Sequence, residues 1–334
     1  MGSQSLKYRF DARNPMVVGG QAVIEGVMMR APGMVATAVR RPDGSIAVRK
    51  EPYVSLAEKN RLLRLPIIRG AVGLIEMLVI GFRSLNFSAE AALGTDLKEG
   101  SGGGKEARKS NTAENLRLGL TLAGALLAGV AIFFLTPILV TTAWFHVDQQ
   151  PLAFNLIAGA IRLTLLLAYL LAISTMKDVR RLFEYHGAEH KVVFTFEREE
   201  DLTVDSAARQ TRFHPRCGTS FLLVVVLLAI IMFGLLDTVL MFWLGALSLP
   251  IRMATHIPLI PVLGGVSYEF IRISARNSDT MIGRLIVAPG LWLQKITTKE
   301  PDEGELEVAL EAIRCALGEK AVTTLRPVPQ AVAG

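Results

Sequence analysis

The chain has 334 residues, of which 51% are hydrophobic, and its formal net charge is +6. Charged residues are crowded between long apolar runs, which is typical of a polytopic membrane protein and excludes an ordinary soluble two-domain protein. Lys and Arg gather beside these runs rather than on one basic face, and the two cysteines give no disulfide framework, so we expect no specific nucleic-acid binding and a reducing compartment.

Residues 1–60 are expected to form a small β-rich unit on the cytoplasmic side. The stretches 34–41 and Ile46–Tyr53 flank a Pro-Asp-Gly-Ser sequence that favours a tight turn, which predicts a β-hairpin. The preceding stretch 19–30, GGQAVIEGVMMR, begins with paired glycines and contains Glu25 as its only internal charge. Glu25 is interpreted either as a partly exposed strand residue or as a member of a site.

Residues 61–95 predict an amphipathic helix, and residues 96–115 predict a flexible linker rich in glycine. Within the helix, charges of alternating sign recur at every seventh residue and therefore share one stripe: Arg69, Glu76, Arg83 and Glu90. A lone helix embedded in lipid would not carry such a stripe. We expect this helix to lie in the membrane interface or to pack against other helices.

Four transmembrane helices are predicted, two within residues 116–176 and two within 218–272. The second contains Arg162 and the third contains Asp237, and their spacing predicts that both charges lie near the far interface, where Arg162 snorkels outward. The fourth is interrupted by prolines and glycines and contains His256, so it is expected to be kinked. A transporter function would depend on this broken span alone.

The distribution of Lys and Arg predicts the topology. The stretch 177–217 carries eight of them, whereas 146–161 carries none, so 177–217 and both termini are expected in the cytoplasm of a multi-pass inner-membrane protein. Residues 273–334 are expected to hold an interfacial segment and a cytoplasmic helix. That helix begins at a capping box formed by Asp302 and Glu305.

The stretch 177–217 also holds a candidate metal site. His186 and His190 are four residues apart, which places both rings on one face of a helix, and His214 and Cys217 offer a second nitrogen–sulfur pair. This set of ligands favours a divalent metal, with Zn²⁺ first. Between the two pairs, 192–196 is expected to be a strand and 205–210 a short helix or turn.

The first pair matches the H-x-x-E-H pattern of inverted zinc peptidases, with Glu189 as the candidate general base. Such sites are completed by a carboxylate far downstream, for which Glu269 is a candidate. Two alternatives stay open. If all four residues bind the metal, the site is closed and structural, and if the histidines only line the membrane boundary, there is no metal.

Four motifs together resemble the YqhQ-like bacterial family, domain of unknown function 1385. They are GGQAVIEGVMMR at 19–30, EYHGAEHK at 184–191, HPRCGTSF at 214–221 and APGLWLQKITTKEP at 288–301. The resemblance covers about residues 16–315 and implies a membrane protein described as a metal-dependent enzyme, without an implied substrate.

Taken together, the sequence predicts an α-helical polytopic membrane protein of about four transmembrane helices, with amphipathic interfacial helices and a small β-rich N-terminal unit. The expected function is metal-dependent hydrolysis at a cytoplasmic site. The alternative is a non-enzymatic assembly or scaffold factor with a structural metal, bound to other membrane proteins or to the biogenesis machinery. The lipid bilayer is the expected environment in either case.

Overall fold

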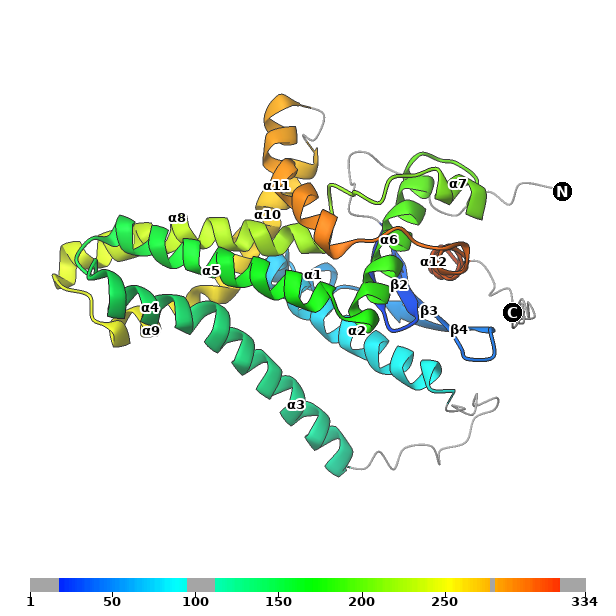
Figure 1. Cartoon of the computed structure of the whole chain (residues 1–334), viewed down its shortest axis with the longest axis horizontal. Helices are drawn as coiled ribbons and strands as arrows, with labels where there is room; N and C mark the ends of the chain where they lie inside the picture. Colours follow the sequence, from blue (N-terminus) through cyan, green and yellow to red (C-terminus); the bar gives the residue numbers. More distant parts are fainter. Residues whose placement is uncertain (1–17, 95–111, 277–279, 319–334) are drawn as a thin grey trace. The chain divides into compact units, whose positions relative to one another are not determined.

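The structure is a computed structural model that describes residues 18–94, 112–276 and 280–318 (Figure 1). Four of its helical segments are long and apolar enough to cross a membrane: Ala123–Phe145, Pro151–Ser174, Gly218–Leu244 and Leu249–Ser274. The predicted fold class is confirmed, because these spans accompany a small antiparallel sheet near the N-terminus. Most of the linker expected at 96–115 lies outside the described residues.

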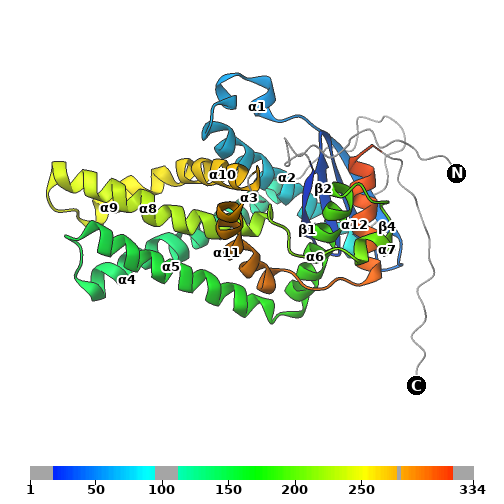
Figure 2. The same cartoon turned by 90° about the horizontal axis from the view of Figure 1, so that it is seen from above.

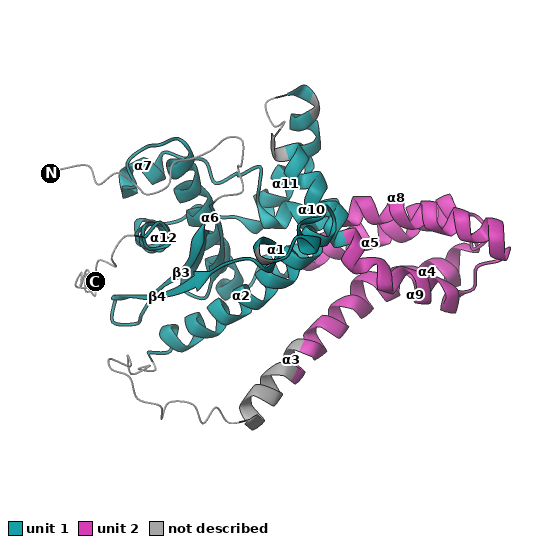
Figure 3. Cartoon of the chain, turned by 180° about the vertical axis from the view of Figure 1, so that it is seen from behind, with its two compact units in different colours: residues 1–96, 170–224, 264–334 teal, residues 97–169, 225–263 magenta. Residues whose placement is uncertain are grey.

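The described residues divide into two compact units (Figure 3). One unit draws on 1–96, 170–224 and 264–334, and the other on 97–169 and 225–263. The first unit therefore brings together three stretches that are far apart in the sequence. It contains the sheet and every candidate ligand, and the second unit contains most of the apolar span residues.

The sheet is a four-stranded antiparallel meander with the order β1-β2-β3-β4. Its strands are β1 (Gly19–Val23), β2 (Gly26–Ala31), β3 (Gly33–Arg40) and β4 (Ile46–Tyr53), so the predicted hairpin between β3 and β4 is confirmed. A two-residue turn of Ile24 and Glu25 joins β1 to β2, and Glu25 has a positive φ of 51° there. Gly26 has no Cβ because one would approach the Ala38 carbonyl oxygen to 2.1 Å.

Helices cover both faces of the sheet, as Figures 1 and 2 show. On one face, Met29 and Ala38 pack against α6 (Lys177–Glu197) and α12 (Glu303–Ala316). On the other face, Met28 and Val39 pack against α2 (Ile68–Ala92). Successive strand residues point to opposite faces, so every apolar residue of a central strand such as β2 finds a helix to pack on.

The predicted C-terminal helix docks on the sheet through its apolar stripe. Leu306, Leu310, Ile313 and Leu317 all lie in the same core as the strands. At its N-terminus both bonds of the predicted capping box are present, because Asp302 caps the Glu305 amide and Glu305 caps the Asp302 amide. Cys315 is buried in the same core, consistent with a packing role.

The charged stripe of α2 has partners within the first unit. Arg69 makes a bidentate ion pair with Glu269, at 2.6 and 2.5 Å. Glu76 accepts hydrogen bonds from the Tyr53 hydroxyl at 2.7 Å and the Ser55 hydroxyl at 2.8 Å. Beside this stripe, the helix packs on the sheet through Ile80, Phe87 and Ala91.

The remaining helices carry the apolar spans. In chain order they are α3 (Thr112–Val130), a π-helical turn η2 (Ala131–Leu135), α4 (Thr136–Phe145), α5 (Pro151–Ser174), α8 (Gly218–Leu244), α9 (Leu249–His256), a 3₁₀ turn η3 (Ile257–Leu259) and α10 (Ile260–Arg276). The 3₁₀ turn contains Pro258, so the predicted irregularity of the fourth span is confirmed. Shorter elements are α1 (Leu56–Lys59), η1 (Leu62–Arg64), α7 (Val204–Ala208) and α11 (Met281–Thr297).

The two charges predicted near the far interface are buried within the second unit. Asp237 is 0% exposed and contacts Arg252 at 3.1 Å and His256 at 2.9 Å. Arg162 is 4% exposed and donates to the Phe133 carbonyl oxygen at 2.8 Å instead of snorkelling outward. Partners on neighbouring helices therefore satisfy these charges, which spacing along a single helix does not reveal.

One local prediction is wrong. Residues 192–196, expected to be a strand, form the last turns of α6. Val192, Val193 and Phe196 favour strands by intrinsic preference, but here they continue the apolar face of α6 against the sheet and α12. The short helix expected near 205–210 is present as α7.

Docking of α12 on the sheet predicts a large effect of truncating its central side chain. We expect Ile313→Ala to lower the free energy of unfolding by about 2–5 kcal/mol, because Ile313 is 0% exposed and its loss leaves a cavity. The matched control is Ile24→Ala, since Ile24 is 42% exposed. Denaturant unfolding in detergent micelles measures both, and equal losses would contradict the docking.

Candidate metal centre

Helix α6 positions the first half of the site. His186 and His190 lie one helical turn apart on it, and their ring centroids are 4.4 Å apart. Gly187 lies between them where the chain after α11 passes close by, and a Cβ there would lie 2.0 Å from the Lys299 carbonyl oxygen. The Lys299 amide donates to the Phe183 carbonyl oxygen at 2.8 Å, so glycine is what allows this segment to dock on the helix.

The second half of the site comes from the segment before α8. Cys217 directly precedes the first residue of that helix. Gln294 of α11 holds the segment in place, because its side chain accepts from the His214 amide at 2.8 Å and donates to the His214 carbonyl oxygen at 2.7 Å. Gln294 also donates to the Ser220 hydroxyl at 3.2 Å, and this bond joins the start of α8 to α11.

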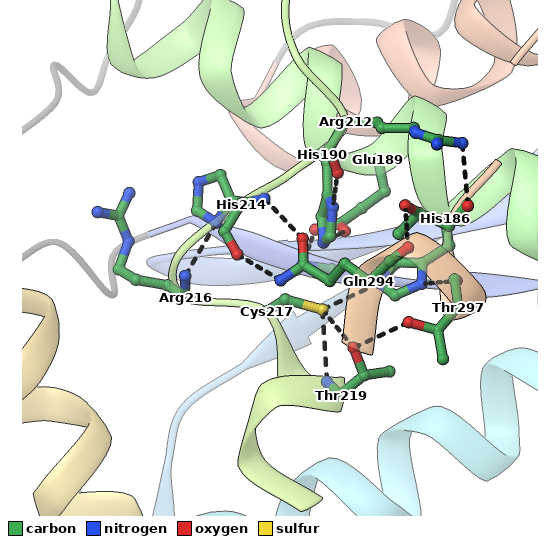
Figure 4. Close-up of polar contacts among 12 residues, drawn as sticks. His186, Glu189, His190, Arg212, His214, Arg216, Cys217, Thr219, Gln294 and Thr297 are labelled. Atoms are coloured by element: carbon green, nitrogen blue, oxygen red, sulfur yellow. Dashed lines mark hydrogen bonds and ion pairs between the residues drawn. The ribbon is translucent and has the colours of Figure 1, made fainter. Parts of the chain in front are cut away.

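These two halves converge on three ligand atoms, shown in Figure 4. One atom each from His186, His190 and Cys217 lies within 4.8 Å of the other two. His186 Nε2 lies 3.1 Å from Cys217 Sγ. A tetrahedral zinc ion with ordinary bond lengths needs its ligand atoms about 3.3–3.6 Å apart, so small side-chain shifts suffice to close the shell.

Backbone carbonyls fix the orientation of both rings. His186 Nδ1 lies 2.8 Å from the Thr297 carbonyl oxygen, and His190 Nδ1 lies 2.5 Å from the Arg212 carbonyl oxygen. A carbonyl only accepts, so each Nδ1 carries a proton, and in its neutral form each ring presents Nε2 as a lone pair. Histidines that bind a metal through one ring nitrogen normally donate the N–H of the other to a carbonyl or carboxylate in this way.

The observation that points most specifically to a metal ligand is made at His190. The residue is 2% exposed, and its Nε2 has no hydrogen-bond partner among the described residues. A buried polar atom without a partner is costly, and a metal ion would satisfy it. The site fits a borderline-soft divalent cation, because it offers two imidazole nitrogens and one thiol sulfur.

The electrostatics of the site favour a thiolate. Burial opposes ionisation of Cys217, but His186 and His190 outweigh it and hold the pKa of the thiol well below its usual range. Burial also disfavours the charged form of His186, yet the Cys217 charge, their hydrogen bond and Glu189 together raise the pKa of His186 to about 9. Metal binding at neutral pH would therefore release a proton from His186.

Glu189 lies beside the three ligands. Its Oε1 accepts from the Gly20 amide of β1 at 3.0 Å, and its Oε2 lies 3.5 Å from His190 Nε2. Glycine at position 20 permits this close approach, because a Cβ there would lie 3.1 Å from Glu189 Cγ. The sheet thus holds one carboxylate oxygen and leaves the other beside the candidate metal position.

His214 lies next to the cluster but faces another partner. Its ring centroid is 5.5 Å from that of His190, while its Nε2 lies 3.3 Å from Glu197 Oε2 and its Nδ1 accepts from the Arg216 amide at 3.3 Å. Burial lowers the pKa of His214 despite the opposing effects of Glu189 and Cys217. The structure therefore brings together three of the four predicted ligands and leaves His214 outside.

Sequence reasoning missed the residues that orient these ligands. Gln294 is 0% exposed and is a polar residue within an apolar stretch, which is a signal that the sequence does contain. The carbonyl oxygens of Thr297 and Arg212 belong to the backbone, so the residue types at these positions do not indicate their role. Glu269, considered as a downstream carboxylate, pairs with Arg69 on α2.

A family described as "Protein of unknown function (DUF1385)" matches residues 65–319. The chain belongs to this family. A similar protein is "Uncharacterized protein YqhQ" of Bacillus subtilis (strain 168), which is 34% identical over 320 residues, 94% of this chain and 96% of the relative. No solved structure matches the chain.

Membership of this family confirms the resemblance but assigns no activity, because the family is one of unknown function. The matched range begins at residue 65 and so includes α2, α6, α11 and α12 together with all three clustered ligands. Any activity must therefore be argued from the site.

The contact across Gly187 predicts that this position tolerates no side chain. We expect Gly187→Ala to push the Lys299 backbone away, remove the Thr297 bond to His186 and weaken metal binding by about 10–100-fold. Competition with a chelator measures this affinity. Gly73→Ala is the matched control, because nothing lies within 4 Å of a Cβ at Gly73, and equal affinities of the two variants would contradict the prediction.

Proposed function

We propose that this protein is a metal-dependent hydrolase of the bacterial inner membrane, with a zinc-type ion held by His186, His190 and Cys217. The observation that carries the proposal is the buried His190 Nε2, which has no hydrogen-bond partner among the described residues and lies beside a cysteine favoured as thiolate. Three protein ligands leave a fourth tetrahedral position for water or substrate, as in catalytic zinc sites.

A divalent ion held by these three residues would supply Lewis acidity, which would lower the pKa of a water molecule beside it and polarise the bond to be cleaved. Glu189 accepts the proton of that water through Oε2, while the Gly20 amide holds Oε1 in place. Glu189 then returns the proton to the leaving group. His186 is the one ligand of the three that retains some exposure, so substrate reaches the site from its side.

The orientation of the chain is part of the proposal. The concentration of Lys and Arg in 177–217 supports a cytoplasmic location for the site and for both termini. Cys217 immediately precedes the span Gly218–Leu244, so the metal would lie at the level where that span meets the cytoplasm. A site in this position suits substrates whose scissile bond lies close to the membrane surface.

A structural metal is the second candidate, and one observation favours it. Glu189 is only 6% exposed, and its Oε2 is close enough to His190 Nε2 to act as a fourth ligand after a small shift. A closed His₂CysGlu shell would leave no position for water. The protein would then be an assembly or scaffold factor whose metal joins α6 to the start of α8.

The three-ligand assignment predicts a clear division among histidine variants. We expect His186→Gln and His190→Gln to lose the metal, because each removes one of three ligands. His214→Gln is the matched control and should retain it, since His214 is directed at Glu197. Metal analysis of the purified proteins distinguishes them, and loss of metal from all three variants would restore His214 to the site.

Replacement of Glu189 separates the two candidate functions. If Glu189 is the general base, Glu189→Gln should keep a wild-type metal content, because glutamine still accepts from Gly20 but no longer takes a proton. Metal analysis and thermal stability are the readouts, so no substrate is needed. Loss of the metal in Glu189→Gln would identify Glu189 as a ligand and favour the structural role.

A further inference from the structure

The segment that leads into α2 exposes an unusual amount of apolar surface. Leu62 is 68% exposed, and the following residues Leu65, Pro66, Ile67 and Ile68 are exposed as well. The stripe continues along α2 at helical spacing through Ile75 and Leu78, which are 60% and 56% exposed. An apolar surface of this extent marks an interaction site.

The same segment has a backbone held in a costly conformation. Ile67 has a φ of 70°, which a β-branched residue adopts only when its surroundings require it. Those surroundings are on α10. The Ile67 amide donates to the Glu269 carboxylate. The Ile67 carbonyl oxygen packs against Gly265, where a Cβ would lie only 2.3 Å from that oxygen.

The contact with α10 sets the depth of this segment. Gly265 belongs to the candidate span Leu249–Ser274, and no charged residue lies between Arg252 and Glu269 in it. Glu269 therefore marks the polar boundary of the span, and Gly265 lies one turn, roughly 6 Å, on its apolar side. Ile67 touches Gly265 and so lies on the same side of that boundary.

The charges of the segment fit this depth. Arg69 follows Ile68 directly and pairs with Glu269 at the boundary, so its charge is neutralised by a bidentate contact. Arg64 turns its guanidinium back onto the Ala57 and Glu58 carbonyl oxygens, away from the apolar side chains. The exposed side chains of this surface are thus mainly leucines and isoleucines, while Arg64 and Arg69 each bond to groups of the protein.

We propose that residues 62–68 and the exposed stripe of α2 are inserted among lipid acyl chains, anchored by the packing of Ile67 on Gly265. The occupant is the bilayer that the four spans already require, because the anchor belongs to one of those spans. The segment is therefore a membrane-inserted turn rather than a cytoplasmic loop. This inference does not depend on the proposed metal chemistry.

Fluorescence quenching in nanodiscs of phosphatidylcholine and phosphatidylglycerol tests the proposal. Bimane is attached at Leu62→Cys and Ile75→Cys, and at Arg49→Cys on β4 as the water-exposed control, since the Arg49 side chain is 49% exposed. The native cysteines are buried, and labelled wild type measures their background. Quenchers are nitroxide-bearing lipids and aqueous iodide.

We expect nitroxide lipids to remove several-fold more fluorescence at positions 62 and 75 than at 49, and iodide to show the reverse order. Iodide quenching at 62 and 75 as strong as at 49 would overturn the proposal. Protection from both quenchers would also overturn it, because it would mean that protein covers the surface.

A second variant tests the anchor in the Leu62→Cys background. Gly265→Ala should reduce lipid quenching at position 62, whereas Gly264→Ala should leave it unchanged, because a Cβ at Gly264 meets only the flexible Leu74 side chain at 3.1 Å. Unchanged lipid quenching in Gly265→Ala would show that the packing on Gly265 does not hold the turn in the bilayer.

Discussion

The close passage of residues 297–299 over α6 is the contact on which the rest of the site depends. Gly187 allows the Lys299 backbone to hydrogen-bond the helix, and this brings the Thr297 carbonyl to His186 and Gln294 to the segment around His214. Two ligand-bearing segments are thereby fixed by a third that contributes no ligand. The same passage delivers the chain to α12, whose docking completes one face of the sheet.

Sequence patterns predicted the elements whose signals are local. Apolar length identified the spans, turn residues identified the β3–β4 hairpin, and spacing identified the capping box of Asp302 and Glu305. The strand expected at 192–196 failed because the packing of α6 overrides the strand preference of valine. For Asp237, the sequence did not reveal the partners on another helix, Arg252 and His256, which bury its charge.

The site was predicted in part for the same reason. The i, i+4 spacing of His186 and His190 is visible in the sequence, and so is the presence of Cys217 at the start of a span. The exclusion of His214 depends on Glu197, and the tautomers of both clustered histidines depend on distant carbonyls. These are tertiary contacts between residues whose types carry no common pattern.

The proposed function depends on a metal ion bound by two imidazoles and one thiolate at the start of α8. X-ray absorption at the metal edge of the purified wild-type protein tests it most directly, because it counts sulfur and nitrogen or oxygen neighbours. We expect one sulfur and two imidazoles, with a water oxygen as the remaining neighbour. Absence of a bound metal, or a shell without sulfur, would contradict it.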